Sequence, residues 1–199
     1  MSYEMYFSVD IETDGDAPGV ASMLSIGIVA LHPKTLEETG RFYRTLQRLP
    51  DAQCNAKTMA WWDQHIDYYV QARKDPQDPK LVMEEMHAFV KHQCRLHLVD
   101  GKGPIPVFMA YPAGFDFSFV YYYSHRFVGE SIFGFSSLDF KSFAMGMLGG
   151  EFTNVKLANY PEEWKTELPH THNALEDALQ QADIFRKAMA WRRRVVGDT

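Results

Sequence analysis

Two acidic residues, Asp10 and Glu12, stand two positions apart at the end of an apolar stretch covering residues 3–12. On a β-strand, side chains two positions apart project to the same face, so these carboxylates would lie side by side. Like charges at that spacing repel each other unless a cation lies between them. The pair therefore predicts a metal site. The alternative interpretation is a turn with Asp14 and Gly15 at its tip, which would leave both acids merely solvated.

A third acid, Asp116, follows Phe115 directly after a predicted strand over residues 105–110. The two residues open a predicted helix, and the partial positive charge at a helix N-terminus favours a carboxylate there. Asp116 therefore joins Asp10 as a candidate for the same site.

A histidine and a fourth acid flank the start of the last predicted helix, in the segment His172-Asn173-Ala174-Leu175-Glu176-Asp177-Ala178. Asn173 and Glu176 match a capping box, so we expect Asn173 to be the N-cap. Asp177 then lies in the first turns of the helix, and His172 lies just before it. An imidazole so placed could accept a proton near neutral pH.

The elements that must position these residues follow from the spacing of apolar side chains. Asp78 and Pro79 fit an N-cap followed by proline at the first helical position. We expect strands over residues 3–12, 24–31, 41–46 and 105–110, a short strand around residues 137–138, and helices after residue 78, over 115–127 and 140–147, and after residue 173. Strands come first and then alternate with helices, which indicates an α/β sandwich around a mixed sheet.

Charge and composition narrow the functional classes. The net charge of −6, from 26 acidic and 20 basic residues, excludes the strongly basic surface of a non-specific duplex-DNA binder. It does not exclude nucleic acid as a substrate, because an acidic cluster gains positive charge when it binds metal ions. The N-terminal residues lack the pattern of a signal peptide, and acids interrupt the first apolar stretch. We therefore expect a cytoplasmic protein with no membrane partner.

The three acidic motifs, DxE at Asp10, FD at Asp116 and HxAxxDA at His172, occur in an order that resembles the DEDDh exonuclease family. Ribonuclease T, oligoribonuclease and polymerase proofreading subunits belong to that family. The resemblance spans nearly the whole chain. It implies a ribonuclease-H-like α/β fold with a central mixed five-stranded sheet flanked by helices, and a single exonuclease domain over residues 1–199.

The resemblance also implies a role for each motif residue. Asp10, Glu12 and Asp177 would hold one divalent cation, and Asp10 would bridge to a second whose water shell is fixed by Asp116. Hard oxygen ligands select Mg²⁺ or Mn²⁺, and such a pair of ions suits phosphodiester hydrolysis. His172 would be the general base. The expected partner is the 3′ end of single-stranded RNA or DNA, and the expected products are nucleoside 5′-monophosphates.

Several alternatives remain open at this level. His170 competes with His172 for the base role, but the HxAxxDA register selects His172. A zinc hydrolase built on His170, His172 and Asp177 would lack a second His or Cys pair with suitable spacing. A DNA exonuclease of the proofreading type and a catalytically silent nucleic-acid-binding module are further alternatives. A homodimer is a candidate assembly.

Substrate contacts are marked less clearly than the acids. Thr13 would help to hold the terminal nucleotide by resemblance, although a turn hydroxyl explains it equally well. Trp61 and Trp62 lie in a segment that looks like a helix of a smaller bacterial and phage exoribonuclease branch, which favours RNA. Adjacent helical side chains diverge by about 100°, and we expect Trp62 to be the one that stacks on a base. Pro112 replaces the Asn that many family members carry, which affects local substrate contacts.

Overall fold

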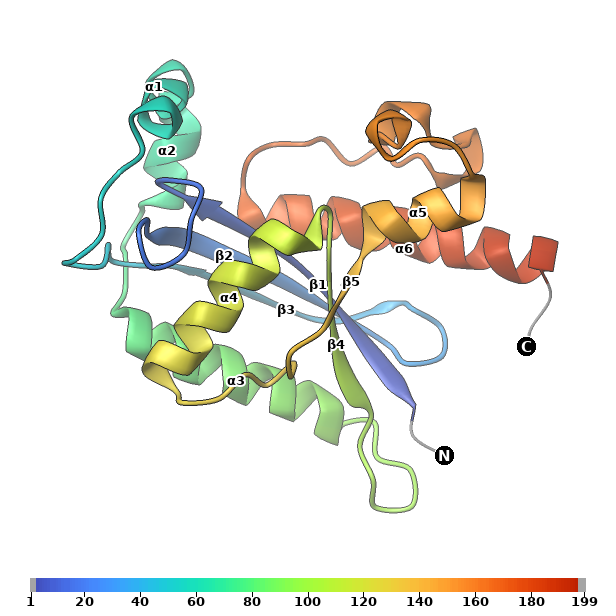
Figure 1. Cartoon of the computed structure of the whole chain (residues 1–199). Helices are drawn as coiled ribbons and strands as arrows, with labels where there is room; N and C mark the ends of the chain where they lie inside the picture. The colour runs from blue at the N-terminus through green and yellow to red at the C-terminus, as the bar shows by residue number, and fades with distance from the viewer. Residues whose placement is uncertain (1–2, 197–199) are drawn as a thin grey trace.

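A computed structural model describes residues 3–196 and shows one five-stranded sheet at its centre (Figure 1). The strands are β1 (Glu4–Thr13), β2 (Met23–Leu31), β3 (Glu38–Thr45), β4 (Ile105–Ala110) and β5 (Ser137–Asp139). They lie in the order β3-β2-β1-β4-β5. β1 is antiparallel to β2 and parallel to β4, so the sheet is mixed, as predicted.

Helices surround this sheet on both faces and at one end. They are α1 (Ala56–Gln64), α2 (Ile66–Ala72), α3 (Pro79–Arg95), α4 (Ala113–Phe127), α5 (Phe140–Leu148) and α6 (Ala174–Val196), with short 3-10 helices at Phe152–Asn154, Leu157–Asn159 and Glu162–Trp164. In Figure 1, α1 and α2 stand beyond the carboxyl end of β1. None of the helices within residues 3–196 is long and apolar enough to cross a membrane.

The alternation of β1 divides the interior into two cores. Phe7, Val9 and Ile11 are buried on the face that α3 and α4 cover. On the opposite face, Tyr6 packs against Phe185 of α6, with ring centroids 5.0 Å apart. As predicted, Asp10 and Glu12 belong to this second face, so the carboxylates point away from the first core and towards α6.

Most predicted elements are present with small differences at their ends. β3 runs over Glu38–Thr45 where residues 41–46 were expected, and α4 begins at Ala113, two residues before the predicted start. The N-cap of α3 is confirmed: Asp78 Oδ1 accepts hydrogen bonds from the backbone N–H groups of Lys80 and Leu81 at 2.9 and 3.2 Å. Local capping chemistry therefore set this boundary correctly.

The start of α6 is fixed by a close approach to β2. A Cβ atom placed on Gly27 would lie 2.2 Å from the backbone carbonyl carbon and oxygen of Ala174, so only glycine leaves room there. One turn further on, Ser8 Oγ donates a 2.8 Å hydrogen bond to the carbonyl of Ala178. Gly27 is also the residue of β2 paired with Asp10 of β1. The helix that carries Asp177 is thereby docked directly beside Asp10.

Candidate active site

The carboxylates of Asp10, Glu12 and Asp177 meet at the carboxyl end of β1. A carboxylate oxygen from each lies within 4.8 Å of an oxygen from the other two. Asp10 and Glu12 are half-buried on the strand, and Asp177, only 2% exposed, lies in the first turn of α6. The structure therefore brings together three of the four predicted metal ligands.

Asp116, the fourth acid, reaches the same place from the other face of the sheet. It lies in the first turn of α4, is 4% exposed, and its Oδ1 accepts a 3.1 Å hydrogen bond from the backbone N–H of Ile11. Ile11 is the residue between Asp10 and Glu12, beyond the last β1–β4 pair at Ser8. The unpaired N–H group at this point of β1 thus holds Asp116 next to the other acids.

Burial and mutual repulsion dominate the electrostatics of these acids. Burial, followed by the charges of neighbouring acids, raises the pKa of Asp10 and of Glu12 well above the usual range. Burial raises the pKa of Asp116 to about 7, against the lowering effect of the hydrogen bond from Ile11. Within residues 3–196, no Lys or Arg forms an ion pair with any of the four. A bound cation would relieve this repulsion.

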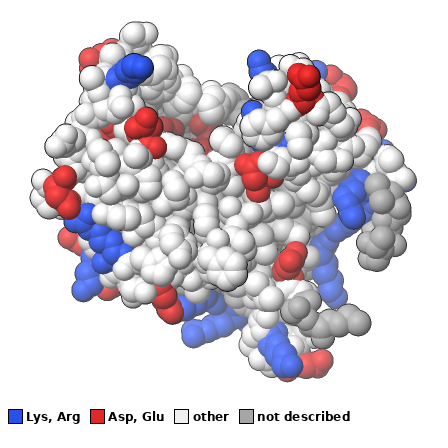
Figure 2. Space-filling view, viewed as in Figure 1, with Lys and Arg blue, Asp and Glu red and all other residues white. Residues whose placement is uncertain are grey.

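The donor set fits hard divalent cations. All four groups are carboxylates, the ligand type that Mg²⁺ and Mn²⁺ prefer, and three of them converge within 4.8 Å. The surface above is accessible, because the face drawn in Figure 2 is hollowed between the α1–α2 side and the α5 side, with acidic atoms visible at the floor of the hollow. Asp10, Glu12, Asp116 and Asp177 are therefore the residues that could hold such ions.

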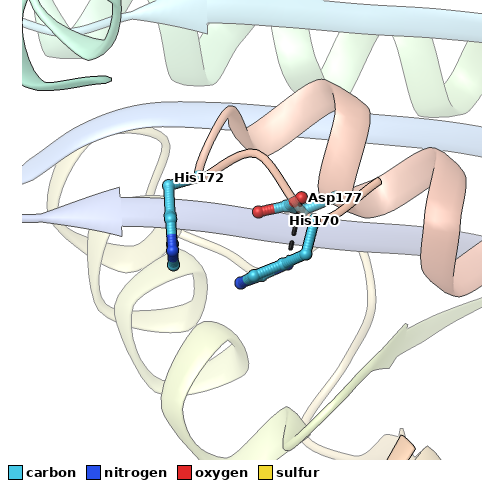
Figure 3. A group of neighbouring side chains, drawn as sticks. All are labelled: His170, His172 and Asp177. Carbon is cyan, nitrogen blue, oxygen red and sulfur yellow. Dashed lines mark ion pairs between the residues drawn. The ribbon is translucent and has the colours of Figure 1, made fainter. Parts of the chain in front are cut away.

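Two histidines lie beside Asp177 in the segment before α6 (Figure 3). His170 Nδ1 is 3.1 Å from Asp177 Oδ1, and this contact is the main reason that the pKa of His170 is raised. His172 makes no such contact, and burial together with the charges of His170 and His65 lowers its pKa. His172 is therefore neutral at neutral pH, the form that can accept a proton.

Hydrogen bonds join the loop that carries the histidines to the first turn of α6. Thr171 donates its backbone N–H to Asp177 Oδ1 at 2.9 Å, and its hydroxyl donates to Glu176 at 2.6 Å. Asn173 is the N-cap, as predicted, because its Oδ1 accepts from the N–H groups of Leu175 and Glu176. Only half of the predicted capping box is present, since Glu176 bonds Thr171 rather than the backbone of Asn173.

The prediction that Trp62 stacks on a nucleotide base is wrong. Trp62 is 2% exposed, packs with Leu24 and Ala72, and donates Nε1–H to the carbonyl of Thr13 at 2.9 Å. Its neighbour Trp61 is half-buried, and its ring lies 4.7 Å from the ring of His172. Trp61 therefore lies beside His172, whereas Trp62 fills a core between α1, α2 and β2.

Thr13 and Asp14 take structural roles in the β1–β2 turn. The hydroxyl of Thr13 donates to the carbonyl of Gly15 at 2.7 Å, the turn role that the sequence left open. Asp14 is fully buried, where it accepts from the N–H of Ser22 at 2.6 Å and pairs with Arg48 at 2.6 Å. The chain does turn here, but Asp14 is buried in the turn, and Asp10 and Glu12 are half-buried beside Asp177 rather than merely solvated.

Gln181 is a site residue that sequence reasoning missed. It is 6% exposed, its Nε2 donates a 2.9 Å hydrogen bond to Asp10 Oδ1, and its Oε1 is buried without a partner among the described residues. Its position four residues after Asp177, on the same face of α6, was the available signal. A buried amide is easily taken for a helix-packing residue, because no motif marks it.

Solved structures with this architecture show the fold class. The nuclease domain of 3′hExo, a DEDDh family member solved with rAMP, superposes with a TM-score of 0.69 at 13% identity, covering 94% of this chain and 92% of that one. Escherichia coli exonuclease I, solved with a dT13 oligonucleotide, superposes with a TM-score of 0.68 at 12% identity, covering 97% of this chain but 42% of that one. The fold is thus ribonuclease-H-like, as predicted.

Sheet, acids and histidine together define a 3′–5′ exonuclease of the DEDDh type. The chain belongs to the Rv2179c-like family, because the model of the 3′–5′ exoribonuclease Rv2179c-like domain matches residues 5–189. A curated relative from Escherichia coli, the 3′–5′ DNA exonuclease Cap18, is 30% identical over 187 residues, or 92% of this chain and 90% of the relative. The family predicted from the three motifs is confirmed.

Proposed function

We propose that the chain removes nucleotides from the 3′ end of single-stranded nucleic acid with the help of two divalent cations, Mg²⁺ or Mn²⁺. The observation that carries the proposal is the convergence of Asp10, Glu12 and Asp177 within 4.8 Å, with no Lys or Arg paired to them among the described residues. Asp10, Glu12 and Asp177 would hold one ion, and Asp10 and Asp116 would serve the second. The products are nucleoside 5′-monophosphates.

When bound, the cations supply a water of lowered pKa and stabilise charge on the leaving 3′ oxygen. The chain supplies the proton acceptor, because a ring nitrogen of neutral His172 takes the proton of the attacking water. Trp61 lies against His172 with ring centroids 4.7 Å apart and limits the orientations of the imidazole. Gln181 holds the Asp10 carboxylate through its Nε2–H group at 2.9 Å.

RNA is the favoured substrate in this proposal. The supporting observation is the family itself, whose description is that of an exoribonuclease and whose model spans residues 5–189. DNA is the second candidate, supported by the relative named as a 3′–5′ DNA exonuclease, with 30% identity over 187 residues. The two differ at the 2′-hydroxyl, so a choice between them requires a group that reads this hydroxyl.

The test is digestion of matched 5′-labelled single-stranded RNA, single-stranded DNA and duplexes in Mg²⁺. We expect a ladder that shortens from the 3′ end, faster on RNA, and strong slowing when the 3′-hydroxyl is blocked. Cuts within a circular single strand would show an endonuclease and contradict the proposal. Asp10→Ala, which removes the shared ligand, should abolish cleavage while binding of the strand persists. A wild-type protein that binds but never cleaves would instead be a silent binding module.

Cytoplasmic location, a homodimer and a single exonuclease domain over residues 1–199 stay predictions. Sedimentation of the purified chain tests the second of these, and limited proteolysis tests the third.

A further inference from the structure

A second group of metal-binding atoms lies next to the acid cluster. His170, His172 and Asp177 each offer one donor atom, and these atoms lie within 4.8 Å of one another (Figure 3). Two imidazole nitrogens and one carboxylate oxygen make a softer set than the carboxylates of Asp10 and Glu12. Such a set suits Zn²⁺ and similar transition metals and does not suit Mg²⁺.

The separation of the first two donors already fits a tetrahedral ion. Zn–N and Zn–O bonds of about 2.0–2.2 Å place two tetrahedral ligand atoms about 3.3 Å apart. His170 Nδ1 and Asp177 Oδ1 are 3.1 Å apart. The third donor, on His172, lies within the 4.8 Å limit, so a rotation of its side chain closes the set. Three protein donors would leave one position of a tetrahedral ion for water or a phosphate oxygen.

The backbone holds His172 at this place. Its φ angle is +52°, in the left-handed region that a non-glycine residue adopts only when its surroundings require it. The imidazole rings of His170 and His172 have centroids 4.4 Å apart, and the ring of Trp61 also packs against His172, with centroids 4.7 Å apart. The side chain of His170 is 53% exposed, so an ion from solvent can reach the set.

We propose that His170, His172 and Asp177 form a Zn²⁺ site through which Zn²⁺ inhibits the nuclease. Zn²⁺ bound there shares Asp177 with the acid cluster and occupies the imidazole nitrogen of His172. Asp177 cannot then serve Mg²⁺ in the same way, and His172 cannot accept a proton. The inhibition rests on the proposed function, whereas the binding of Zn²⁺ does not.

Binding is tested by a calorimetric titration of Zn²⁺ into the full chain in the presence of excess Mg²⁺. We expect one Zn²⁺ to bind, and His170→Asn to weaken that binding at least about tenfold, the usual effect of disturbing a metal site. His125→Asn, a change at an exposed histidine of α4, is the matched control and should leave the affinity unchanged. The variant Asp10→Asn with Glu12→Gln should still bind Zn²⁺. The proposed site would be overturned if His170→Asn left the Zn²⁺ affinity unchanged, or if the Asp10→Asn and Glu12→Gln variant no longer bound Zn²⁺.

Inhibition is tested by the rate in saturating Mg²⁺ as Zn²⁺ is added, with each variant compared with its own rate without Zn²⁺. The Zn²⁺ concentration for half inhibition should rise at least about tenfold in His170→Asn and stay unchanged in His125→Asn. Activation by Zn²⁺ alone would overturn the inhibitory role. If Mg²⁺ supports no cleavage while His170-dependent Zn²⁺ binding is seen, the proposed function fails and the metal site stands.

Discussion

At the scale of single residues, the local contacts of each acid and histidine determine its role in the site. Asp177 and Asp116 are buried and hydrogen-bonded to backbone N–H groups, at 2.9 Å from Thr171 and 3.1 Å from Ile11. Asp177 also contacts the imidazole of His170, at 3.1 Å from its Nδ1 atom. His172 forms no ion pair with a carboxylate among the described residues. The two histidines therefore differ in basicity and in access, although only one residue separates them.

His172 is expected to be the proton acceptor, so His172→Ala should lower kcat by roughly 10²–10⁴-fold, the usual contribution of a positioned base. Metal binding should change much less, because the ions are held by carboxylates. His170→Ala should be far milder, since its contact with Asp177 raises its pKa and already occupies its Nδ1 atom. Single-turnover rates in saturating Mg²⁺ measure both. If His170→Ala abolished activity while His172→Ala remained active, His170 and not His172 would be the proton acceptor.

Gln181 is expected to act as a positioning residue for Asp10. Gln181→Leu removes the 2.9 Å hydrogen bond to Asp10 Oδ1 and should weaken Mg²⁺ affinity or activity by roughly 10–100-fold. The Mg²⁺ concentration at half-maximal rate separates this role from a loss of packing, because a packing defect alone would lower thermal stability without moving that concentration. Gln180→Leu on the neighbouring position, whose Nε2 bonds the carbonyl of Leu168, is the matched control.

At the scale of secondary-structure elements, the site depends on how two helices approach the end of one strand. α4 brings Asp116 to the unpaired N–H of Ile11, and α6 brings Asp177 across Gly27 of β2. Asp139 secures the start of α4 by accepting from the N–H of Ala113 at 2.8 Å, and it also caps α5 at Ser142. The acids thus meet because hydrogen bonds and close packing fix the starts of α4 and α6 next to the end of β1.

Gly27→Ala is expected to disable the enzyme through α6. Its new Cβ would lie 2.2 Å from backbone atoms of Ala174, which cannot move without shifting the helix and Asp177 with it. We expect loss of nearly all activity and a lower melting temperature, measured by thermal unfolding. Gly146→Ala in α5 is the matched control, because its added Cβ would meet no atom within 4 Å outside its chain neighbours and the backbone of its own helix. That change should stabilise the helix by about 0.5–1 kcal/mol.

The sequence predicted the elements well where periodicity or capping is local. Asp78 and Asn173 marked helix starts correctly, and the alternation of β1 placed Asp10 and Glu12 on one face. It failed where the answer depends on a partner far away in the chain. Which of Trp61 and Trp62 is buried is decided by Leu24 and by the carbonyl of Thr13, which no local pattern reveals.

At the scale of the whole molecule, an acid cluster without a Lys or Arg partner among the described residues couples metal binding to stability. The net charge of −6 already places a negative field around the protein, and the cluster concentrates it at one end of the sheet. Without metal, repulsion among these carboxylates lowers the stability of the fold. The same negative charge attracts cations to the site. The free energy of unfolding should depend on Mg²⁺ and on pH together.

The metal-free protein is expected to lose stability as pH rises. The folded-state pKa values of Asp10 and Glu12 are raised, and that of Asp116 is raised to about 7, whereas unfolded carboxyls titrate near pH 4. At these three carboxyls the folded state holds protons more tightly than the unfolded state, so the stability that they contribute is full below about pH 4 and declines as pH rises through about 7. Buried His87 acts in the opposite direction, because burial lowers its pKa and its protonation destabilises the fold in acid.

Thermal unfolding with EDTA and with Mg²⁺, at about pH 5.5 and about pH 8, separates the two effects. His87 contributes equally with and without metal, so the difference between the two series reports the acid cluster. We expect Mg²⁺ to raise the melting temperature at the higher pH by on the order of 5 °C and to have little effect at the lower pH. Asp10→Asn, which removes one charge from the cluster, should raise the metal-free melting temperature at the higher pH and reduce the response to Mg²⁺. A melting temperature that responds equally to Mg²⁺ at both pH values would show that repulsion among these acids does not limit the stability of the fold.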